Sequence, residues 1–385
     1  MRYPQLSAHH APCTVQLVSA TDNTIDIGEA WRRLLIESQS PEIIFQTSGY
    51  FDFISELPNK NNKQILLLIK NTLSQKIIGV IPLRTGQRTF SLQAGSCTIG
   101  RLRLDTIALL GSIPLTPHHR DVLDTLLQFL FNEFPGEDSI AMQSLPMDSY
   151  FYHYLKNSAL VKKSYGIYIK DGWRSCHTTP LPISFAVYLS QLKAKKRYNV
   201  QRQIKQFEKN LGPVALIRIQ LPADIPLLAR AIKKLASPDI QKTMMGETHY
   251  AALSRKEILL CYILTSNTQP CAVIIGIFSN NTFHIHNIIY DWNLSQYSLG
   301  ATVLHLAIED LTDNLNVNLI DYGYGNPEHS HHSGNIIQQR GHVFLYKKTW
   351  RNRFLFTAHA AFTATLKLVK KIKTRRRVLL NTAAV

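Results

Sequence analysis

The sequence predicts a mixed α/β protein of two lobes, built from a unit that occurs twice along the chain. The first observation is length, because 385 residues suit two domains of about 150–200 residues better than one core. The second is order: each half carries two apolar strands joined by a polar turn, then a further strand, a helix and a closing strand. The third is composition, since 45% hydrophobic and 18% charged residues are typical of globular domains.

Apolar patterning places the individual elements. One-faced apolar repeats predict helices, and short apolar runs bounded by turn residues predict strands. In the amino-terminal half we expect helices over 29–38, 45–54 and 122–131 and strands over 65–69, 77–83, 89–99, 104–110 and 139–142. In the carboxyl-terminal half we expect helices over 224–236 and 300–311 and strands over 258–264, 270–278, 282–290 and 319–324. Between the halves, Ser184 is expected to cap one long basic helix that runs to Asn210.

The net charge of +17 is concentrated near the carboxyl terminus. No Asp or Glu follows Glu328, and twelve Lys and Arg lie between Arg340 and Arg377. A helix over 354–373 is expected, with an apolar stripe of Phe354, Ala358, Phe362, Thr365, Leu366 and Val369. This pattern is typical of a packing helix with a basic end or of an anchor on anionic lipid, and we expect packing plus a peripheral membrane contact.

A secreted or membrane-spanning protein is not expected. The first twenty residues contain no continuous apolar run, and no stretch of about 18 apolar residues occurs. The five cysteines are far apart and form no CxxC pair, which disfavours a disulfide framework or a thiolate zinc site. We therefore expect reduced thiols and a cytoplasmic protein, in peripheral contact with the inner face of the membrane through its basic tail.

A family resemblance is carried by four segments: Ser184–Leu211, Ile258–Phe278, Asn287–Gly300 and Leu319–Gly325. They resemble segments of the acyltransferases of the GNAT superfamily, in the branch of the FemAB-like and CelD-like proteins, and Ile258–Phe278 is similar to the paired strands of their repeat. Ser184–Leu211 resembles the helix that opens their catalytic repeat. Asn287–Gly300 is similar to their Tyr-Asp, loop and Ser-Pro-Gly segment, with Leu299 in place of Pro. Leu319–Gly325 resembles their Asp-Phe-Gly strand, although 328–332 carries Glu and His where the family often has Tyr-Lys.

The resemblance implies tandem GNAT-like repeats, each with a mixed central sheet flanked by helices. It implies a degenerate lobe over 1–175, a catalytic lobe over 176–350 and a basic helical tail over 351–385. In that fold acyl-CoA lies between two splayed strands, and its pyrophosphate meets the amino end of the next helix. Here the phosphate-binding residues would be Ser298, Leu299, Gly300 and Ala301. Free N–H groups and the helix dipole favour an anion there, although these residues alone also describe an ordinary helix start.

Two histidines on one predicted strand are candidates for proton transfer. His284 and His286 alternate along the strand, so a regular pleat places both on one face. Imidazole suits a general base near neutral pH, and we expect His286 as the base and His284 at the substrate. Two ordinary histidines on a sheet face, or a metal pair, are the alternatives, and no metal is expected.

The remaining candidates lie at the ends of the two strands that would splay. Asp321 is expected to act as base or to orient an amine, or else to cap or pair with a lysine. Tyr322 or Tyr324 is expected to protonate the leaving thiolate. Tyr290 and Asp291 end the other strand and are expected at the substrate, with a plain turn as the alternative for Asp291.

The resemblance implies direct attack on the thioester. Covalent acyl-enzyme chemistry has no support in the sequence, because no Gly-x-Ser-x-Gly elbow or Ser/His/Asp order is present. The resemblance implies transfer of an acetyl or other acyl group from acyl-CoA to an amine or hydroxyl of a sugar, glycan or envelope precursor, in polysaccharide biosynthesis. One alternative is a FemAB-type transferase that uses aminoacyl-tRNA on a peptidoglycan precursor, which the basic helix also suits. Another is a basic scaffold that has lost catalysis. The cluster of Glu328, His329, His331 and His332 is expected to be a solvated loop.

Overall fold

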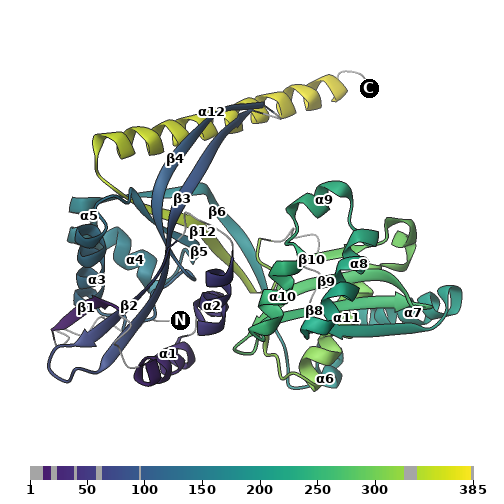
Figure 1. Ribbon diagram of the computed structural model, residues 1–385. Coiled ribbons are helices and arrows are strands. Elements are labelled where there is room, and N and C mark those ends of the chain that lie inside the picture. Colours follow the sequence, from purple (N-terminus) through teal and green to yellow (C-terminus); the bar gives the residue numbers. More distant parts are fainter. Residues whose placement is uncertain are drawn as a thin grey trace. The chain divides into compact units, whose positions relative to one another are not determined.

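The structure is a computed structural model that describes residues 12–18, 24–38, 41–57, 63–94, 97–324 and 336–382. The chain forms two compact units (Figure 1). Unit 1 takes its described residues from 1–40, 59–173 and 339–385, and unit 2 from 41–58 and 174–338. Each unit therefore contains a segment that is remote in sequence from the rest of it. The lobe boundaries predicted from the sequence stay a prediction.

Unit 1 contains a sheet in which two neighbouring strands run parallel. Its strand order is β1-β2-β3-β4-β5-β12-β6, with β6 contributing its first part. The strands β4 and β5 are parallel and are joined through helix α3, whereas β1–β2, β2–β3, β3–β4 and β5–β12 are antiparallel. The bounds are β1 Cys13–Leu17, β2 Gln64–Asn71, β3 Ile77–Ala94, β4 Cys97–Leu109, β5 Ser139–Pro146, β6 Tyr165–Pro180 and β12 Ile336–Lys347.

The two faces of this sheet carry different helices. On one face α3 (Arg120–Glu133), α4 (Tyr150–Asn157) and α5 (Ala159–Ser164) bury a large apolar core against the strands. On the other face a smaller cluster forms around Phe90, Phe344 and Phe356, the last of which comes from α12 (Trp350–Thr382). Helix α1 (Thr24–Glu37) packs against β3. Alternation along β12 explains the division, since Val343 belongs to the first core and Phe344 to the second.

The prediction of a separate strand over 89–99 is wrong. Strands β3 and β4 form one long hairpin whose pairing extends from Leu83 opposite Leu109 to Ala94 opposite Cys97. The sequence between 84 and 89 is polar and resembles a connection, which is why the apolar pattern divides β3 in two. Backbone pairing with β4 holds this polar stretch in the sheet regardless of its composition.

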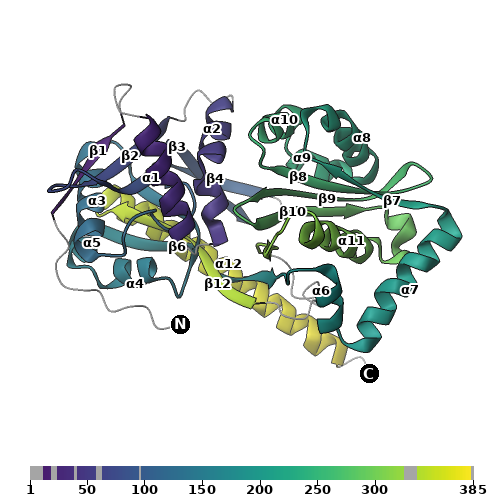
Figure 2. The same cartoon turned by 90° about the horizontal axis from the view of Figure 1, so that it is seen from below.

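Unit 2 repeats the parallel pair of unit 1. Its strand order is β6-β11-β10-β9-β8-β7, with β10 and β11 parallel and joined by α11. One face carries α6, α7 and α11, and the other carries α8, α9 and α10 (Figure 2). The strand bounds are β7 Val214–Ile219, β8 Leu259–Ser266, β9 Gln269–Ser279, β10 Thr282–Tyr290 and β11 Leu319–Asp321. The helix bounds are α6 Phe185–Gln191, α7 Ala194–Leu211, α8 Ile225–Leu235, α9 Pro238–Thr243, α10 Glu247–Arg255 and α11 Leu299–Asp313.

The internal repeat predicted from the order of elements is confirmed in the connections. In unit 1 the series β2, β3, β4, α3, β5 ends in a parallel strand pair, and in unit 2 the series β8, β9, β10, α11, β11 does the same. Unit 2 also contains a segment from the amino-terminal half. This segment forms the 3-10 helix η1 (Pro41–Gln46) and α2 (Ser48–Glu56), and α2 contacts α10.

The single basic helix expected from Ser184 to Asn210 is two helices. Ser184 does cap the first one, since its Oγ accepts from Val187 N at 3.3 Å. The chain leaves helical geometry at Leu192 and Lys193, between α6 and α7. No Gly or Pro marks the break in the sequence. The break instead lets the side chain of Leu192 enter the core of unit 2, where it is 3% exposed.

The buried stripe of α12 differs from the one that apolar patterning predicts. Phe354 and Val369 are exposed, whereas Asn352, Phe356 and His359 are buried. The polar members are accommodated because they find partners: Asn352 Nδ2 donates to Asp138 O at 3.2 Å, and His359 Nδ1 lies 2.5 Å from the Tyr168 hydroxyl. Within the described part of the chain, no helix is both long and apolar enough to span a membrane.

Two phenylalanines of α12 that are two residues apart, and so lie on different faces of the helix, test this stripe. We expect Phe356→Ala to lower the free energy of unfolding by about 3–5 kcal/mol, because it empties a buried position among Phe90, Phe344 and Tyr346. Phe354→Ala is the matched control and should cost less than about 1 kcal/mol, since its side chain is 68% exposed. Urea denaturation of both variants measures the difference, and equal losses would contradict the burial assignment.

Candidate active site

The parallel strands β10 and β11 separate after a short paired stretch. Their pairing covers three positions and ends where His284 lies opposite Asp321. Beyond this point β10 stays paired with β9 as far as Tyr290. The chain after β11 instead stays with β6, because Tyr322 N donates to His177 O at 2.9 Å and His177 N donates to Gly323 O at 3.2 Å. The two strands therefore diverge, as the family resemblance implied.

A β-bulge at His286 interrupts β10 at the start of the diverging part. The register with β9 shifts between Ile285 and Asn287, and His286 is the extra residue. A bulge reverses the alternation of side chains, which is why Ile285 before it and Ile288 after it both contact the core beneath α11. The regular alternation expected for His284 and His286 is thus interrupted, and the bulge redirects the His286 side chain.

His284 and Asp321 form a buried pair at the point of divergence. His284 Nδ1 lies 3.7 Å from Asp321 Oδ2, and the two side chains are 7% and 0% exposed. Asp321 Oδ1 also accepts from Gly323 N at 2.7 Å, which fixes the carboxylate. The ring of Phe45, from η1, packs on His284 with ring centroids 5.4 Å apart. At 3.7 Å the pair is an electrostatic contact, not a hydrogen bond.

His286 is held as a neutral imidazole. Its side chain is exposed at the surface of the strand. Desolvation and, to a smaller extent, the nearby His284 together lower its pKa to about 4. At neutral pH the ring can therefore accept a proton without first losing one.

The amino terminus of α11 provides backbone donors beside β10. Ser298 precedes the helix in the left-handed conformation, with φ 52° and ψ 44°. Its Oγ accepts from Gln203 Nε2 of α7 at 3.2 Å. In the first turn, Leu299 is fully buried and Thr302 is 1% exposed, and the Thr302 hydroxyl has no partner among the described residues. Ala301 N and Thr302 N donate to Ser298 O at 2.9 and 3.0 Å, so the N–H groups of Leu299 and Gly300 are the ones that, with the positive dipole end, suit a phosphate.

Gly300, in the first turn of α11, lies against β10. A Cβ built at Gly300 would lie 3.4 Å from Tyr290 Cδ1 and 3.8 Å from Ile288 Cγ2, which is ordinary contact. Tyr290 is further fixed by Trp292, with ring centroids 4.9 Å apart. Asp291 caps the following 3-10 helix η3 (Trp292–Tyr297), since its carboxylate accepts from Asn293 N at 3.0 Å. The turn role weighed for Asp291 is therefore present in the structure.

The two candidate tyrosines lie beyond β11 in different surroundings. The Tyr322 hydroxyl is buried, and burial raises its pKa, with Thr179 opposing the shift through a hydrogen bond. Its phenol therefore stays protonated at neutral pH. The Tyr324 ring lies under the Arg174 guanidinium at 3.8 Å from the ring centroid. The cluster expected at 328–332 lies outside the described residues.

Three residues near the divergence have no signal in the sequence. His177 of β6 is 3% exposed, and neither ring nitrogen has a hydrogen-bond partner among the described residues. Phe45 and Gln203 reach the site from η1 and α7. They are far apart in sequence from β10, so only the fold reveals them. Among the described residues, no group of three or more His, Cys, Asp or Glu is placed to hold a metal.

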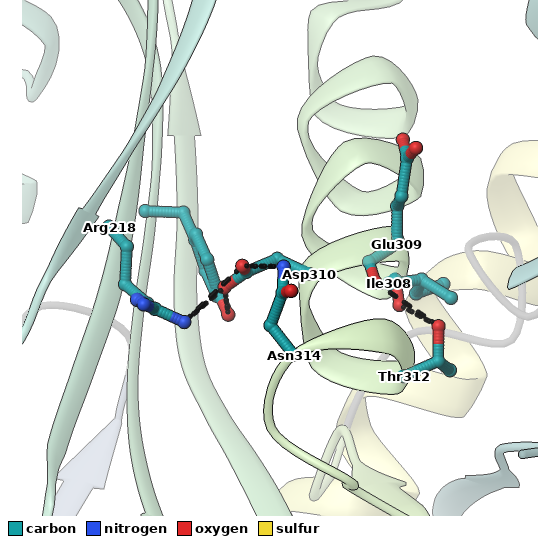
Figure 3. Close-up of polar contacts among 7 residues, drawn as sticks. Arg218, Ile308, Glu309, Asp310, Thr312 and Asn314 are labelled. Atoms are coloured by element: carbon teal, nitrogen blue, oxygen red, sulfur yellow. Dashed lines mark hydrogen bonds and ion pairs between the residues drawn. The ribbon is translucent and has the colours of Figure 1, made fainter. Parts of the chain in front are cut away.

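A polar network at the far end of α11 sets the position of this helix against the sheet (Figure 3). Asp310 accepts from Arg218 Nη1 of β7 at 3.2 Å, from the Tyr262 hydroxyl of β8 at 2.8 Å and from Asn314 Nδ2 at 2.8 Å. Glu309 points away from this group in Figure 3. Because a helix is stiff, fixing one end on two strands helps to hold the other end beside β10.

Comparison with known proteins agrees with this geometry. Residues 194–331 match the family described as acetyltransferase (GNAT) domain, a span that includes α7, β10, α11 and β11. Among proteins of curated function, no sequence matches the chain.

Solved structures share the fold at low sequence identity. FemX superimposes with a TM-score of 0.54 and 10% identity, over 80% of this chain and 96% of that chain. A conserved protein of unknown function from Bacteroides thetaiotaomicron gives 0.51 and 12%, over 87% and 100%. The C-terminal domain of a putative lysylphosphatidylglycerol synthetase from Agrobacterium fabrum gives 0.50 and 7%, over 88% and 97%. At these low sequence identities, the similarity shows a shared fold and nothing more.

The match of residues 194–331 to the GNAT acetyltransferase domain supports an acyltransferase, and the predicted fold class of tandem GNAT-like repeats is confirmed. The structural similarity to FemX agrees with the FemAB-like part of the resemblance found in the sequence. The CelD-like side stays a prediction.

Proposed function

We propose that the protein transfers an acyl group, acetyl in the simplest case, from acyl-CoA to an amine or hydroxyl in the space between β10 and β11. The observation that carries the proposal is the divergence of these strands after His284 and Asp321, with a bulge at His286 and the start of α11 alongside. A thioester between the strands and a pyrophosphate at Ser298–Ala301 would use the backbone groups that the divergence and the helix start expose.

The proposed chemistry is direct attack on the thioester. The acceptor nitrogen or oxygen bonds to the carbonyl carbon, the C–S bond breaks, and CoA leaves as a thiolate that takes up a proton. His286 accepts the proton of the acceptor as that proton becomes acidic in the transition state, which suits a base whose pKa is low in the free protein. The Asp321 carboxylate lies 3.7 Å from His284 Nδ1 and is proposed to hold the His284 ring beside the acceptor. Tyr322, kept protonated, is proposed to donate a hydrogen bond to the leaving sulfur.

The acceptor is proposed to be a sugar, a glycan or an envelope precursor in the cytoplasm. The CelD-like resemblance of Ser184–Leu211 supports this class. A second donor is also supported, because the fold resembles that of FemX and one face of α7 exposes Tyr198, Arg202, Lys205 and Lys209 along a shallow groove of about 320 Å³. Such a face suits the phosphates of an aminoacyl-tRNA as well as those of CoA.

Substitutions of Gly300 test the proposed donor site. We expect Gly300→Asp to weaken acetyl-CoA binding at least tenfold in isothermal titration, because it adds a negative charge where the pyrophosphate would lie. The fold should persist, since an acidic residue is favourable in a first helical turn. Gly300→Ala is the control and should bind within about threefold of the wild type, since its methyl group fits against Tyr290.

Titration with charged tRNA in the same series separates the two donors. Tight binding of the charged tRNA, with none of acetyl-CoA at millimolar concentration, would replace the acyl-CoA proposal with the aminoacyl one. Binding of acetyl-CoA without turnover on a broad panel of acceptors would favour the scaffold that has lost catalysis.

His286 and Asp321 are tested through turnover and its pH dependence. We expect His286→Ala or Asp321→Asn to lower kcat about 10²–10⁴-fold with little change in acetyl-CoA affinity, measured as release of the CoA thiol. His153→Ala, an exposed histidine of α4, is the control. In the wild type, the acidic limb of kcat/KM should lie below pH 6.5, because protonation of His286 occurs near pH 4 and activity is lost as the pH falls towards that value. If the acidic limb of the kcat/KM profile is unchanged in His286→Ala, a residue other than His286 is the base.

A peripheral membrane contact is proposed for the distal part of α12, which exposes Leu368, Val369 and Ile372. A chain that ends at Leu366 keeps the buried Phe356 and His359 and should fold. We expect it to lose sedimentation with phosphatidylglycerol vesicles, while the full chain sediments with these and not with neutral vesicles. Equal sedimentation of the two chains with these vesicles would contradict a membrane contact by the distal part of α12.

A further inference from the structure

Unit 1 contains a cavity that the acyl-transfer chemistry does not use. Its volume is about 570 Å³, within the range of about 300–1,000 Å³ typical of small-molecule sites. Strands β3, β4, β5, β6 and β12 all contribute side chains to it. Its described lining includes the cations Arg84, Arg88 and Lys170 and no carboxylate. The cavity is therefore strongly positive for its size.

Two arginines on β3 lie on either side of a glycine. Side-chain alternation places Arg84, Gly86 and Arg88 on one face of the strand, and all three line the cavity. Gly86 has no side chain to fill the space between the two arginines. Thr106 Oγ1 donates to the carbonyl oxygen of Gly86 at 3.0 Å. Burial lowers the pKa of Arg88, and the charge of Arg84 lowers it further, so the two cations repel. Arg84 and Arg88 both make other interactions. Each has five donors, so a ligand would add to these contacts.

Two more donors point to the same space from other strands. Lys170 Nζ lies 5.2 Å from the centroid of the Phe90 ring, which also lines the cavity. His342 sits at a β-bulge of β12, between Gly341 and Val343. Its Nδ1 accepts from Ser144 N at 3.3 Å, which assigns the proton of the neutral ring to Nε2. Nε2–H is then a donor, so three strands supply N–H groups to one cavity.

We propose that this cavity binds a phosphate ester of a small polar molecule, with the phosphoryl group between Arg84 and Arg88 and with Lys170 and His342 as further donors. Guanidinium pairs match the geometry of phosphate oxygens, and an anion would offset the repulsion between the two cations. The cavity is larger than a phosphate ion, and Gln143, Thr85 and the rings of Phe90 and Phe344 line the remaining space. These groups suit the hydroxyls and apolar faces of an organic moiety. The inference is independent of the donor and acceptor of the acyl transfer.

The experiment is isothermal titration of the full chain with glucose 1-phosphate, glucose and sodium phosphate. We expect glucose 1-phosphate to bind at least tenfold more tightly than either of the others. Arg88→Met keeps the length of the side chain and removes its charge, and should weaken this binding at least tenfold. Arg84→Met and Lys170→Met are measured as well, so that failure of one variant to fold does not decide the result. Arg101→Met, an exposed arginine of the same hairpin outside the cavity, should bind like the wild type.

Acetyl-CoA titration of the same variants separates this site from the one at α11. Unchanged acetyl-CoA affinity in Arg88→Met, together with lost glucose 1-phosphate binding, supports the proposal. Equal glucose 1-phosphate affinity in the wild type and all three cavity variants overturns it. Loss of that binding in Gly300→Asp alone would also overturn it, by placing the phosphate at the amino end of α11. Failure of the wild type to bind glucose 1-phosphate at millimolar concentration overturns the proposal for phosphate esters of this size.

Discussion

The candidate active site depends on one constraint, which is that every strand in a sheet must keep its backbone hydrogen bonds. Strands β10 and β11 can part after His284 and Asp321 because each keeps a partner on its other side: β10 stays with β9, and the chain after β11 stays with β6. Backbone groups along a strand alternate between its two edges. The parting therefore turns polar groups of two strands toward one another, and a ligand with an extended amide backbone could satisfy them.

The two repeats differ in how far their parallel strands stay paired. In unit 1 the parallel pair β4 and β5 stays paired to the last residue of β4, where Leu109 lies opposite Met142. The segment before α3, which corresponds to the phosphate turn, is tied to β3, since Val80 N donates to Leu115 O at 3.0 Å. A Cβ at Gly79 would meet Thr116 Oγ1 at 2.8 Å, so the segment packs without space. The same connection thus leads to diverging strands in unit 2 and to a packed segment beside β3 in unit 1.

The sequence was sufficient for regular elements and insufficient where the backbone departs from regularity. The bounds of β10 were predicted to the residue, and α11 within two residues, because apolar patterning and turn residues report burial on one face. The bulge at His286 could not be predicted, since no residue type marks it, and it decides where the histidine points. Phe45, Gln203 and His177 also escaped prediction, because their closeness to the site depends on contacts between distant segments. The roles proposed for His286 and Asp321 remain predictions.

The charge pattern of the sequence has the same limit. Counting Lys and Arg along the chain does not reveal which of them are buried or paired inside the folded protein. Part of the basic run after Glu328 is not a surface patch: Arg340 is buried, and Arg351 Nη1 pairs with Asp138 Oδ1 at 2.7 Å. Lys347 donates to Phe134 O, so it too serves the packing of unit 1. The cations of the unit 1 cavity come instead from β3 and β6, in segments whose sequence is only mildly basic. Alternation along β3 places Arg84 and Arg88 on one face, but only the fold brings Lys170 of β6 and His342 of β12 into the same cavity.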